Sequence, residues 1–260
     1  MIVTLLTDFG TTDPYAGVLK GVLLGRDPSL TLVDLTHGIA PGDIASAAYA
    51  LLAAYPYFPP GTTHLVVVDP GVGTSRRPIA IAAGGQHFVG PDNGVFSYLL
   101  EREQDAHVVE VTADRLFLAP LSGTFHGRDL FAPVAAALAG GAALEALGRP
   151  LTDPVRLPPL SPEQAEDGAL SGRILAIDRF GNCITSIPAS AIPPEAERVD
   201  LEVAGLRIGG IHGTFAAGSG VDPFVIRGSS GFLEIVVNGG AAAERLGVRV
   251  GDPVILRRNE

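Results

Sequence analysis

An acid at the end of an apolar run and two arginines stand close together in residues 66–77, which read VVVDPGVGTSRR. The apolar run ends on Asp69, and a Pro-Gly-Val-Gly turn then leads to Arg76 and Arg77. An open α/β sheet presents its ligand-binding groups at the carboxyl ends of its strands, so an acid in this position can face a ligand. A neighbouring arginine favours the ionised form of the carboxylate. This segment restricts the range of functions that the chain could have more than any other segment does.

Three other segments place an ionisable side chain beside glycine, where the backbone can approach a ligand closely. They are TDFG at 7–10, DLTHG at 34–38 and GTFHGRD at 123–129. Histidine can hold or shuttle a proton near neutral pH and aspartate can orient or accept one, so Asp69, Arg76 and His126 can together activate water. Simpler roles stay open, because Asp69 can end a strand through a side-chain turn and His126 can begin a helix.

Several common site motifs are incomplete in this sequence. GVG at 71–73 lacks the further glycine of dinucleotide-binding loops and the Gly-Lys-Ser/Thr ending of phosphate-binding loops. No His-Glu-x-x-His, paired cysteines or Asp-x-Asp spacing supports a metal site. GSG at 218–220 and GSSG at 228–231 do not form the Gly-x-Ser-x-Gly turn of serine hydrolases. We therefore predict neither a bound metal nor a nucleophilic serine.

The composition indicates a well-buried globular enzyme or binding protein, since 47% of the residues are hydrophobic and 18% are charged. The net charge of -10 argues against a nucleic-acid partner, which needs a basic face, and favours a small molecule, cations included. No apolar stretch reaches the roughly 18 to 20 residues that span a bilayer, and the N-terminus lacks the basic start of a signal peptide. The single cysteine, Cys183, fits a reducing compartment. We expect a cytoplasmic protein without membrane contact.

The first 150 residues alternate short apolar runs with helical patterns, which is typical of βα units and a mainly parallel sheet. Strands are predicted at 2–6 and 64–68, the second one delivering the acid described above. Asp43 can cap a helix whose apolar stripe runs over 44–55. His64 precedes an apolar run, and it is interpreted as a structural histidine.

The composition changes at residues 151–167, which hold four prolines and are predicted to form a semi-rigid linker. Beyond it, residues 168–260 contain short β-rich runs separated by glycine-rich turns. This pattern favours a small barrel or sandwich. The chain is therefore predicted to hold an α/β domain at 1–150 and a β domain at 168–260.

Seven blocks in chain order give the sequence a resemblance, over nearly its full length, to the S-adenosylmethionine hydroxide adenosyltransferase family, which is related to the fluorinase and chlorinase enzymes. The blocks are TDFG at 7–10, DLTHGI at 34–39, VDPGVGT at 68–74 with Arg76, GPDNG at 90–94, FHGRD at 125–129, DRFGN at 178–182 and LEIVVNGG at 233–240. The resemblance implies a Rossmann-like α/β domain joined to a small β-barrel domain. It also implies a homotrimer that binds substrate between the N-terminal domain of one subunit and the C-terminal domain of the next.

The activity that the resemblance implies is hydrolysis of S-adenosylmethionine to adenosine and methionine, with no cofactor and no metal. Asp69, Arg76 and His126 would position and activate the water or hydroxide that attacks the ribose C5′ atom. Arg77 can replace Arg76 in this set, although the spacing of Arg76 from Asp69 matches the family. A sulfonium is already a good leaving group, so the enzyme must chiefly align the nucleophile with the C–S bond.

The resemblance also implies the residues that hold the substrate. Asp8 would bond the ribose hydroxyls, Asp178 the ammonium of the methionine moiety and Ser229 its carboxylate. Asn182 would bond the adenine, and Val237, Asn238 and Gly239 would meet the adenine edge mainly through backbone groups. The fluorinase has an arginine after its carboxylate-binding serine, whereas this chain has Ser230, so the carboxylate would be held less strongly.

Three alternatives stay open at this point. A halide adenosyltransferase belongs to the same family, but the halogenating relatives lack the Asp-Arg-His set, and the extra loop of the fluorinase is absent from residues 77–94. A sensor that binds adenosine or S-adenosylmethionine without useful turnover is the second. A metal-dependent phosphohydrolase is the third, and its activity would be abolished by chelators.

Overall fold

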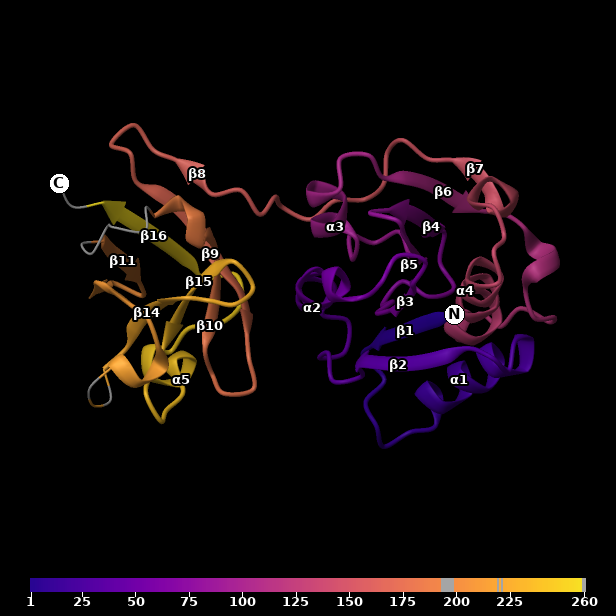
Figure 1. Ribbon diagram of the computed structural model, residues 1–260, viewed down its shortest axis with the longest axis horizontal. Helices are drawn as coiled ribbons and strands as arrows, with labels where there is room; N and C mark the ends of the chain where they lie inside the picture. The colour runs from indigo at the N-terminus through magenta and orange to yellow at the C-terminus, as the bar shows by residue number, and fades with distance from the viewer. Residues whose placement is uncertain (193–198, 219, 221, 259–260) are drawn as a thin grey trace. The chain divides into compact units, whose positions relative to one another are not determined.

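A computed structural model describes residues 1–192, 199–218, 220 and 222–258. The chain divides into two compact units, residues 1–158 and residues 159–260 (Figure 1). Within the described residues, no helix has the length and apolar character needed to cross a membrane.

Unit 1 is built on a mixed sheet in the order β2-β1-β3-β5-β4-β6-β7. Its strands are β1 (Ile2–Thr7), β2 (Thr31–Thr36), β3 (Thr63–Val67), β4 (Pro78–Ala83), β5 (Gln86–Pro91), β6 (His107–Val111) and β7 (Gly148–Pro150). The pairs β1–β2, β1–β3 and β3–β5 are parallel, whereas β4–β5, β4–β6 and β6–β7 are antiparallel.

The prediction of a mainly parallel sheet therefore holds for the half of the sheet that contains β1, β2 and β3, and fails for the other half. The physical reason is the turn between β4 and β5, where Ala83 pairs with Gln86 and only Gly84 and Gly85 lie between them. Both glycines have positive φ, 56° and 74°, as a tight two-residue hairpin requires. The Gly-Gly pair was the sequence signal for an antiparallel connection.

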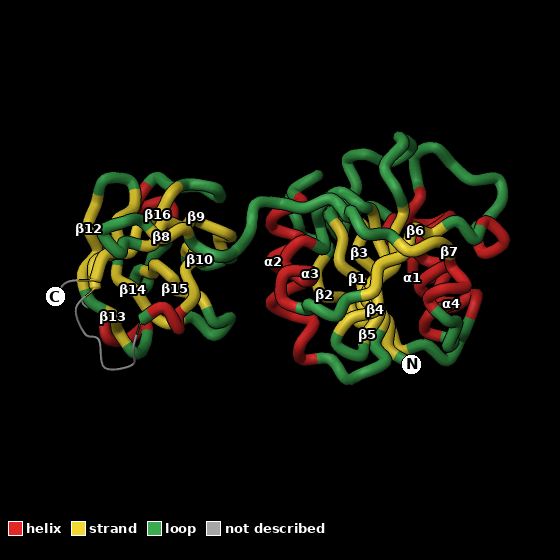
Figure 2. Tube along the Cα trace, turned by 90° about the horizontal axis from the view of Figure 1, so that it is seen from above, coloured by secondary structure: helices red, strands yellow, loops and turns green. Residues whose placement is uncertain are grey.

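Helices cover both faces of this sheet, with α1 and α4 on one side and α2 and α3 on the other (Figure 2). The α-helices of unit 1 are α1 (Tyr15–Arg26), α2 (Ile44–Ala54), α3 (Ser97–Arg102) and α4 (Ala132–Ala139), and its short helices are η1 (Tyr55–Tyr57), η2 (Asp114–Leu116), the π-helical turn η3 (Gly127–Phe131) and η4 (Leu144–Leu147). The predicted cap of α2 is confirmed, because Oδ1 of Asp43 accepts a hydrogen bond from the Ser46 amide at 3.0 Å. Leu5, Leu19 and Phe131 lie in the core between α1, α4 and the sheet.

His64 lies fully buried in β3, as its interpretation as a structural histidine requires. Its Nδ1 is 2.7 Å from Oγ1 of Thr4, its Nε2 is 2.8 Å from Oε1 of Gln86, and its ring stacks on Phe88 at 4.8 Å. Burial lowers the pKa of His64 to about 4, and the hydrogen bond with Gln86 opposes this only in part. The imidazole is therefore a neutral part of the core at physiological pH.

Unit 2 is a single curled sheet in the order β12-β11-β16-β9-β10-β15-β14-β13, with β8 paired to β9. Its strands are β8 (Glu163–Gln164), β9 (Leu170–Ile177), β10 (Cys183–Pro188), β11 (Val199–Val203), β12 (Leu206–Gly209), β13 (Ile211–His212), β14 (Phe224–Arg227), β15 (Phe232–Val236) and β16 (Pro253–Arg258), and its helices are η5 (Ala189–Ala191), η6 (Phe215–Ala217) and α5 (Ala242–Leu246). The sheet curls until β12 lies near β14, which gives a nearly barrel-shaped unit. Cys183 is fully buried in its core, and burial raises the pKa of the thiol to about 11. Cys183 therefore acts as a small apolar filler.

Candidate active site

The parallel pairing of β1 with β3 brings two acids to one edge of the sheet. Thr7 pairs with Val67, so Asp8 and Asp69 leave neighbouring strands at the same end. A cavity of about 620 Å³ opens there. Its lining consists of Asp8, Phe9, Asp13, Tyr15, Pro41, Gly42, Val67, Asp69, Pro70, Val72, Thr124, Phe125, His126 and Gly127. The cavity thus gathers three of the four segments that stand out in the sequence.

Asp69, Arg76 and His126 form one connected set beside this cavity. Nε of Arg76 donates hydrogen bonds to both carboxylate oxygens of Asp69, at 2.9 and 3.0 Å, and Nη2 donates to Oδ2 of the same group. Nη2 of Arg76 also lies 2.8 Å from Nδ1 of His126. The side chains of Asp69 and Arg76 are 5% and 9% exposed, and the guanidinium lies 5.0 Å from the ring of Phe131. The set is therefore held within a desolvated pocket, where charge interactions are strong.

The approach of His126 to Arg76 depends on the glycine-rich loop after Asp69. Gly73 has a φ of +78°, and a Cβ atom at this position would lie 2.1 Å from the carbonyl oxygen of Gly123. Only glycine permits this close packing of the 70–76 loop on the segment that carries His126. Two blocks that are 50 residues apart in the sequence are joined in this way.

The hydrogen bond from Arg76 fixes the protonation of His126. A guanidinium has donors only, so Nδ1 of His126 must accept and the proton of the neutral ring must lie on Nε2. Burial and the charge of Arg76 both lower the pKa of His126, while Asp69, Asp129 and the backbone of Ser122 oppose them. His126 is therefore a neutral imidazole whose lone pair is already engaged.

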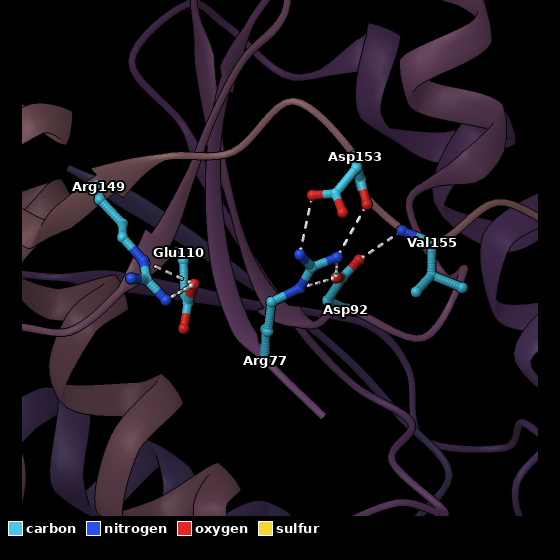
Figure 3. A network of polar contacts seen from close by, with 6 residues as sticks. All are labelled: Arg77, Asp92, Glu110, Arg149, Asp153 and Val155. Atoms are coloured by element: carbon cyan, nitrogen blue, oxygen red, sulfur yellow. Dashed lines mark hydrogen bonds and ion pairs between the residues drawn. The ribbon is translucent and has the colours of Figure 1, made fainter. Parts of the chain in front are cut away.

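Arg77 points away from Asp69 and belongs to a different network, shown in Figure 3 together with a separate Glu110–Arg149 pair. Its Nε donates to Oδ2 of Asp92 at 2.7 Å, and its Nη1 and Nη2 donate to Oδ1 and the carbonyl oxygen of Asp153 at 2.9 and 2.8 Å. Oδ1 of Asp92 accepts from the amide of Val155 at 2.8 Å. Within unit 1, Arg77 and Asp92 thus hold the start of the proline-rich segment, and the arginine beside Asp69 is Arg76.

Asp8 lies in the same cavity, and its Oδ2 accepts a hydrogen bond from the amide of Gly42 at 2.8 Å. Sequence reasoning missed two other groups of this lining. The first is Asp13, an acid five residues after Asp8. The second is an aromatic cluster of Phe9, Tyr15 and Phe125, whose ring centroids lie 5.4 to 5.8 Å apart. The spacing of Asp8 and Asp13 along one loop was the only signal for the acid.

Unit 2 contains a second cavity, of about 530 Å³, lined by Phe180, Asn182, Phe215, Val237, Gly239 and Gly240. The structure thus brings together Asn182, Val237 and Gly239, three of the residues that the family resemblance assigns to adenine binding. Asn238 lies between the last two, and its Nδ2 donates to the carbonyl oxygen of Gly218 at 3.0 Å. These residues come from the loop before β10 and the segment after β15.

Two aromatic side chains of this cavity were not predicted. Phe180 is 76% exposed and Phe215 is 50% exposed, which is unusual for large apolar side chains. Phe180 lies in the predicted block DRFGN, where its type was the available signal. Phe215 stands in η6, outside every block, so no sequence pattern indicated it.

Asp178 organises the loop that carries Phe180 and Asn182. Its Oδ1 accepts from the amides of both residues at 2.9 Å, and its Oδ2 accepts from Nδ2 of Asn182 at 2.8 Å. Asp178 is outside the lining of the cavity, as is Ser229, which is exposed in the turn between β14 and β15. Burial and the nearby charge of Asp178 both raise the pKa of Glu234, a buried acid of β15.

Within the part of the chain that the structure describes, no group of three or more His, Cys, Asp or Glu side chains is arranged to hold a metal ion.

The chain thus combines an α/β unit that carries an acid–arginine–histidine set with a curled β unit that carries a cavity lined by two phenylalanines. The S-adenosylmethionine hydroxide adenosyltransferase N-terminal domain matches residues 3–148, and the C-terminal domain of the same family matches residues 172–255. The chain belongs to the S-adenosylmethionine hydroxide adenosyltransferase family, as its sequence blocks predicted.

Known relatives extend over almost the whole chain. It is 43% identical to the (R)-S-adenosyl-L-methionine hydrolase of Thermus thermophilus, with 98% of each sequence covered. A fluorinase of Actinoplanes sp. is 29% identical, over 96% of this chain and 95% of the fluorinase. A solved structure of an uncharacterized conserved protein from Thermotoga maritima superposes with a TM-score of 0.90 at 37% identity, covering 99% of this chain and 100% of that one.

Proposed function

We propose that this protein hydrolyses S-adenosyl-L-methionine to adenosine and L-methionine. The observation that carries the proposal is the contact of Asp69, Arg76 and His126 at the cavity where β1 and β3 end. The identity to a named (R)-S-adenosyl-L-methionine hydrolase over 98% of both chains supports the choice of substrate. Asp8, Asp13 and Asp69 give the cavity carboxylates that favour a cationic sulfonium.

In the proposed reaction, the oxygen of a water molecule forms a bond to the ribose C5′ atom while the C5′–S bond breaks. The electron pair of that bond stays on sulfur, so methionine leaves as a neutral thioether. Of the three residues, Arg76 has only donors and His126 has its lone pair engaged by Arg76, which leaves Asp69 as the acceptor for the proton that the water loses as the C5′–O bond forms. Asp69 thus orients the nucleophile, and Arg76 and His126 hold Asp69 and the site in place.

The adenosyl and methionine groups are proposed to be bound as follows. Asp8 accepts the ribose hydroxyls, and Asn182, Val237, Asn238 and Gly239 meet the adenine, with Phe180 and Phe215 against its faces. Asp178 pairs with the ammonium and Ser229 takes the carboxylate of methionine. Neither a metal nor a cofactor takes part in this proposal.

We also propose a homotrimer in which unit 1 of one subunit and unit 2 of the next bind one substrate molecule. The two groups of binding residues lie in separate units of the chain, which supports this arrangement. Sedimentation equilibrium should give three times the chain mass, and a monomer with full activity would contradict it.

The test of the proposed function is turnover of S-adenosylmethionine in oxygen-18 water, with chromatography and mass spectrometry of the products. We expect adenosine that carries the label at its 5′ oxygen, together with one methionine for each adenosine. Unlabelled adenosine would overturn attack by water at C5′. Formation of 5′-chloro-5′-deoxyadenosine in chloride buffer would instead indicate a halide adenosyltransferase, and binding without turnover would indicate a sensor.

Replacement of Phe180 by alanine is expected to weaken adenosine binding and to raise KM by about tenfold, since stacking of a base on an aromatic ring is worth about 1–3 kcal/mol. The turnover number should change little, because Phe180 is proposed to touch the adenine and not the reacting C5′ atom. Calorimetric titration with adenosine measures the affinity. Tyr57→Ala is the matched control, since Tyr57 is an aromatic residue of η1 that is 80% exposed and lines neither cavity. Equal effects of the two substitutions would contradict the assignment.

A further inference from the structure

The segment DLTHG at 34–38 stands out in the sequence, yet the proposed reaction does not use it. His37 follows β2 and is only 7% exposed. Its Nδ1 lies 2.8 Å from Oγ1 of Thr7, and its Nε2 lies 3.0 Å from Oδ1 of Asp34. Nζ of Lys20 donates to the other oxygen of Asp34 at 2.6 Å. A buried imidazole therefore joins a surface ion pair to the last residue of β1.

The direction of each hydrogen bond in this chain of contacts can be assigned. Oγ1 of Thr7 accepts from the amide of Phe9 at 3.2 Å, and its own hydrogen can be donated to Nδ1 of His37 when Nε2 carries the ring proton. Nε2 of His37 then carries a proton that faces Asp34, because a carboxylate can only accept. Nε2 lies 3.0 Å from Oδ1 of Asp34, but the contact does not have the geometry of an aligned hydrogen bond, and Nε2 has no other hydrogen-bond partner among the described residues.

The state of Asp34 supports this assignment. Burial acts to raise the pKa of Asp34, but its close contacts with Lys20 and His37 outweigh burial, and the pKa is lowered. Asp34 is thus a carboxylate that holds the Nε2–H tautomer of His37, and Lys20 holds Asp34 in turn.

His37 contacts the loop that carries Asp8 at both ends of that loop. Its imidazole contacts Thr7, which precedes Asp8, and its carbonyl oxygen accepts from the amide of Gly10 at 2.8 Å. Oδ2 of Asp8 accepts a hydrogen bond from the amide of Gly42, so part of the hydrogen-bonding capacity of the carboxylate is already used. The orientation of the Asp8 carboxylate therefore depends on the conformation of the 7–10 loop. The two contacts of His37 hold that conformation.

We propose that His37 is a positioning residue that aims the Asp8 carboxylate at the vicinal hydroxyls of a nucleoside. This inference rests on the proposed function, because it takes Asp8 to be the group that accepts the ribose hydroxyls. The ligand chemistry is a cis-diol, with two O–H donors that one well-placed carboxylate can accept. Without the Thr7–His37 contact, the Asp8 carboxylate is expected to lose its fixed orientation toward the hydroxyls.

The experiment is calorimetric titration of the full-length protein with adenosine and with 2′,3′-dideoxyadenosine, which lacks both ribose hydroxyls. His37→Ala and Thr7→Val should weaken adenosine binding by about tenfold, the effect of losing a hydrogen bond to a charged group, and should weaken binding of the dideoxy analogue by less than about twofold. His37→Asn should restore most of the affinity for adenosine, because its Oδ1 can accept from Thr7. KM for S-adenosylmethionine should follow the same order.

Equal weakening of both ligands in the His37→Ala and Thr7→Val variants would overturn the proposal, since a general structural defect acts on both. His37→Asn with no recovery would also overturn it. If His37→Ala does not fold, Thr7→Val carries the same comparison with an isosteric change. The matched control is His87→Asn, a half-buried histidine of β5 that lines neither cavity and should change neither affinity. If the wild-type protein binds adenosine more tightly than the dideoxy analogue but releases no methionine from S-adenosylmethionine, the proposed hydrolysis is wrong. The comparison of the two ligands still tests the role of His37 in that case.

Discussion

Asp69→Asn is expected to lower the turnover number for S-adenosylmethionine by about 10²- to 10⁴-fold, the range that a positioned proton-accepting group contributes. Asparagine keeps the shape of the side chain, but it removes the charge and one of the acceptors that face Arg76. The guanidinium of Arg76 would then be buried, at 9% exposure, beside a neutral partner. The nucleophile would lose its acceptor and its alignment together. Single-turnover release of adenosine, followed by chromatography, measures the loss.

Breaking a buried ion pair also destabilises a protein, by about 3–5 kcal/mol, so a matched variant is needed to separate the two effects. Asp92→Asn serves this purpose, because Asp92 is an equally buried carboxylate paired with an arginine, Arg77, in the same unit. We expect a similar loss of stability from Asp92→Asn and little loss of turnover below the unfolding temperature. Equal losses of turnover in the two variants would assign the effect of Asp69→Asn to stability alone.

Acid should destabilise unit 1 by about 3 kcal/mol between pH 6.5 and pH 4 through His64 alone, at 1.36 kcal/mol per unit of pKa shift. The folded-state pKa of His64 is about 4, because of burial, whereas an unfolded histidine titrates near 6.5. Between pH 6.5 and pH 4, His64 binds a proton in the unfolded chain but stays neutral in the folded chain. The free energy of unfolding therefore falls as the pH falls. Above pH 6.5 both states are neutral and this contribution vanishes.

Urea denaturation followed by circular dichroism at a series of pH values measures this effect. The slope of the unfolding free energy against pH should be smaller in His64→Gln by about 1.4 kcal/mol per pH unit, the value for one proton. His107→Gln, at an exposed position of β6, is the control and should leave the slope unchanged. An identical slope in His64→Gln and the wild type would show that another group causes the acid sensitivity.

The local chemistry of the chain was sufficient for several elements. The apolar run before Asp69 predicted β3 to within one residue, and Asp43 predicted the start of α2. Such features depend on neighbouring residues, because strand propensity, turn glycines and helix caps act over a few positions. The β4–β5 hairpin was missed although its signal, Gly84 and Gly85, is local, whereas the pairing of β4 with β6, in which Ala82 lies opposite His107, joins residues too far apart for such a signal.

By itself, the sequence determined which residue types are available for chemistry and, through its seven blocks, the family of the protein. Only the tertiary structure decided which of them meet. It placed Arg76 rather than Arg77 beside Asp69, and it brought His126 to Arg76 across 50 residues. The physical reason is that these contacts follow from the order of the strands and from close loop packing at Gly73, both of which are properties of the whole fold and not of any local segment.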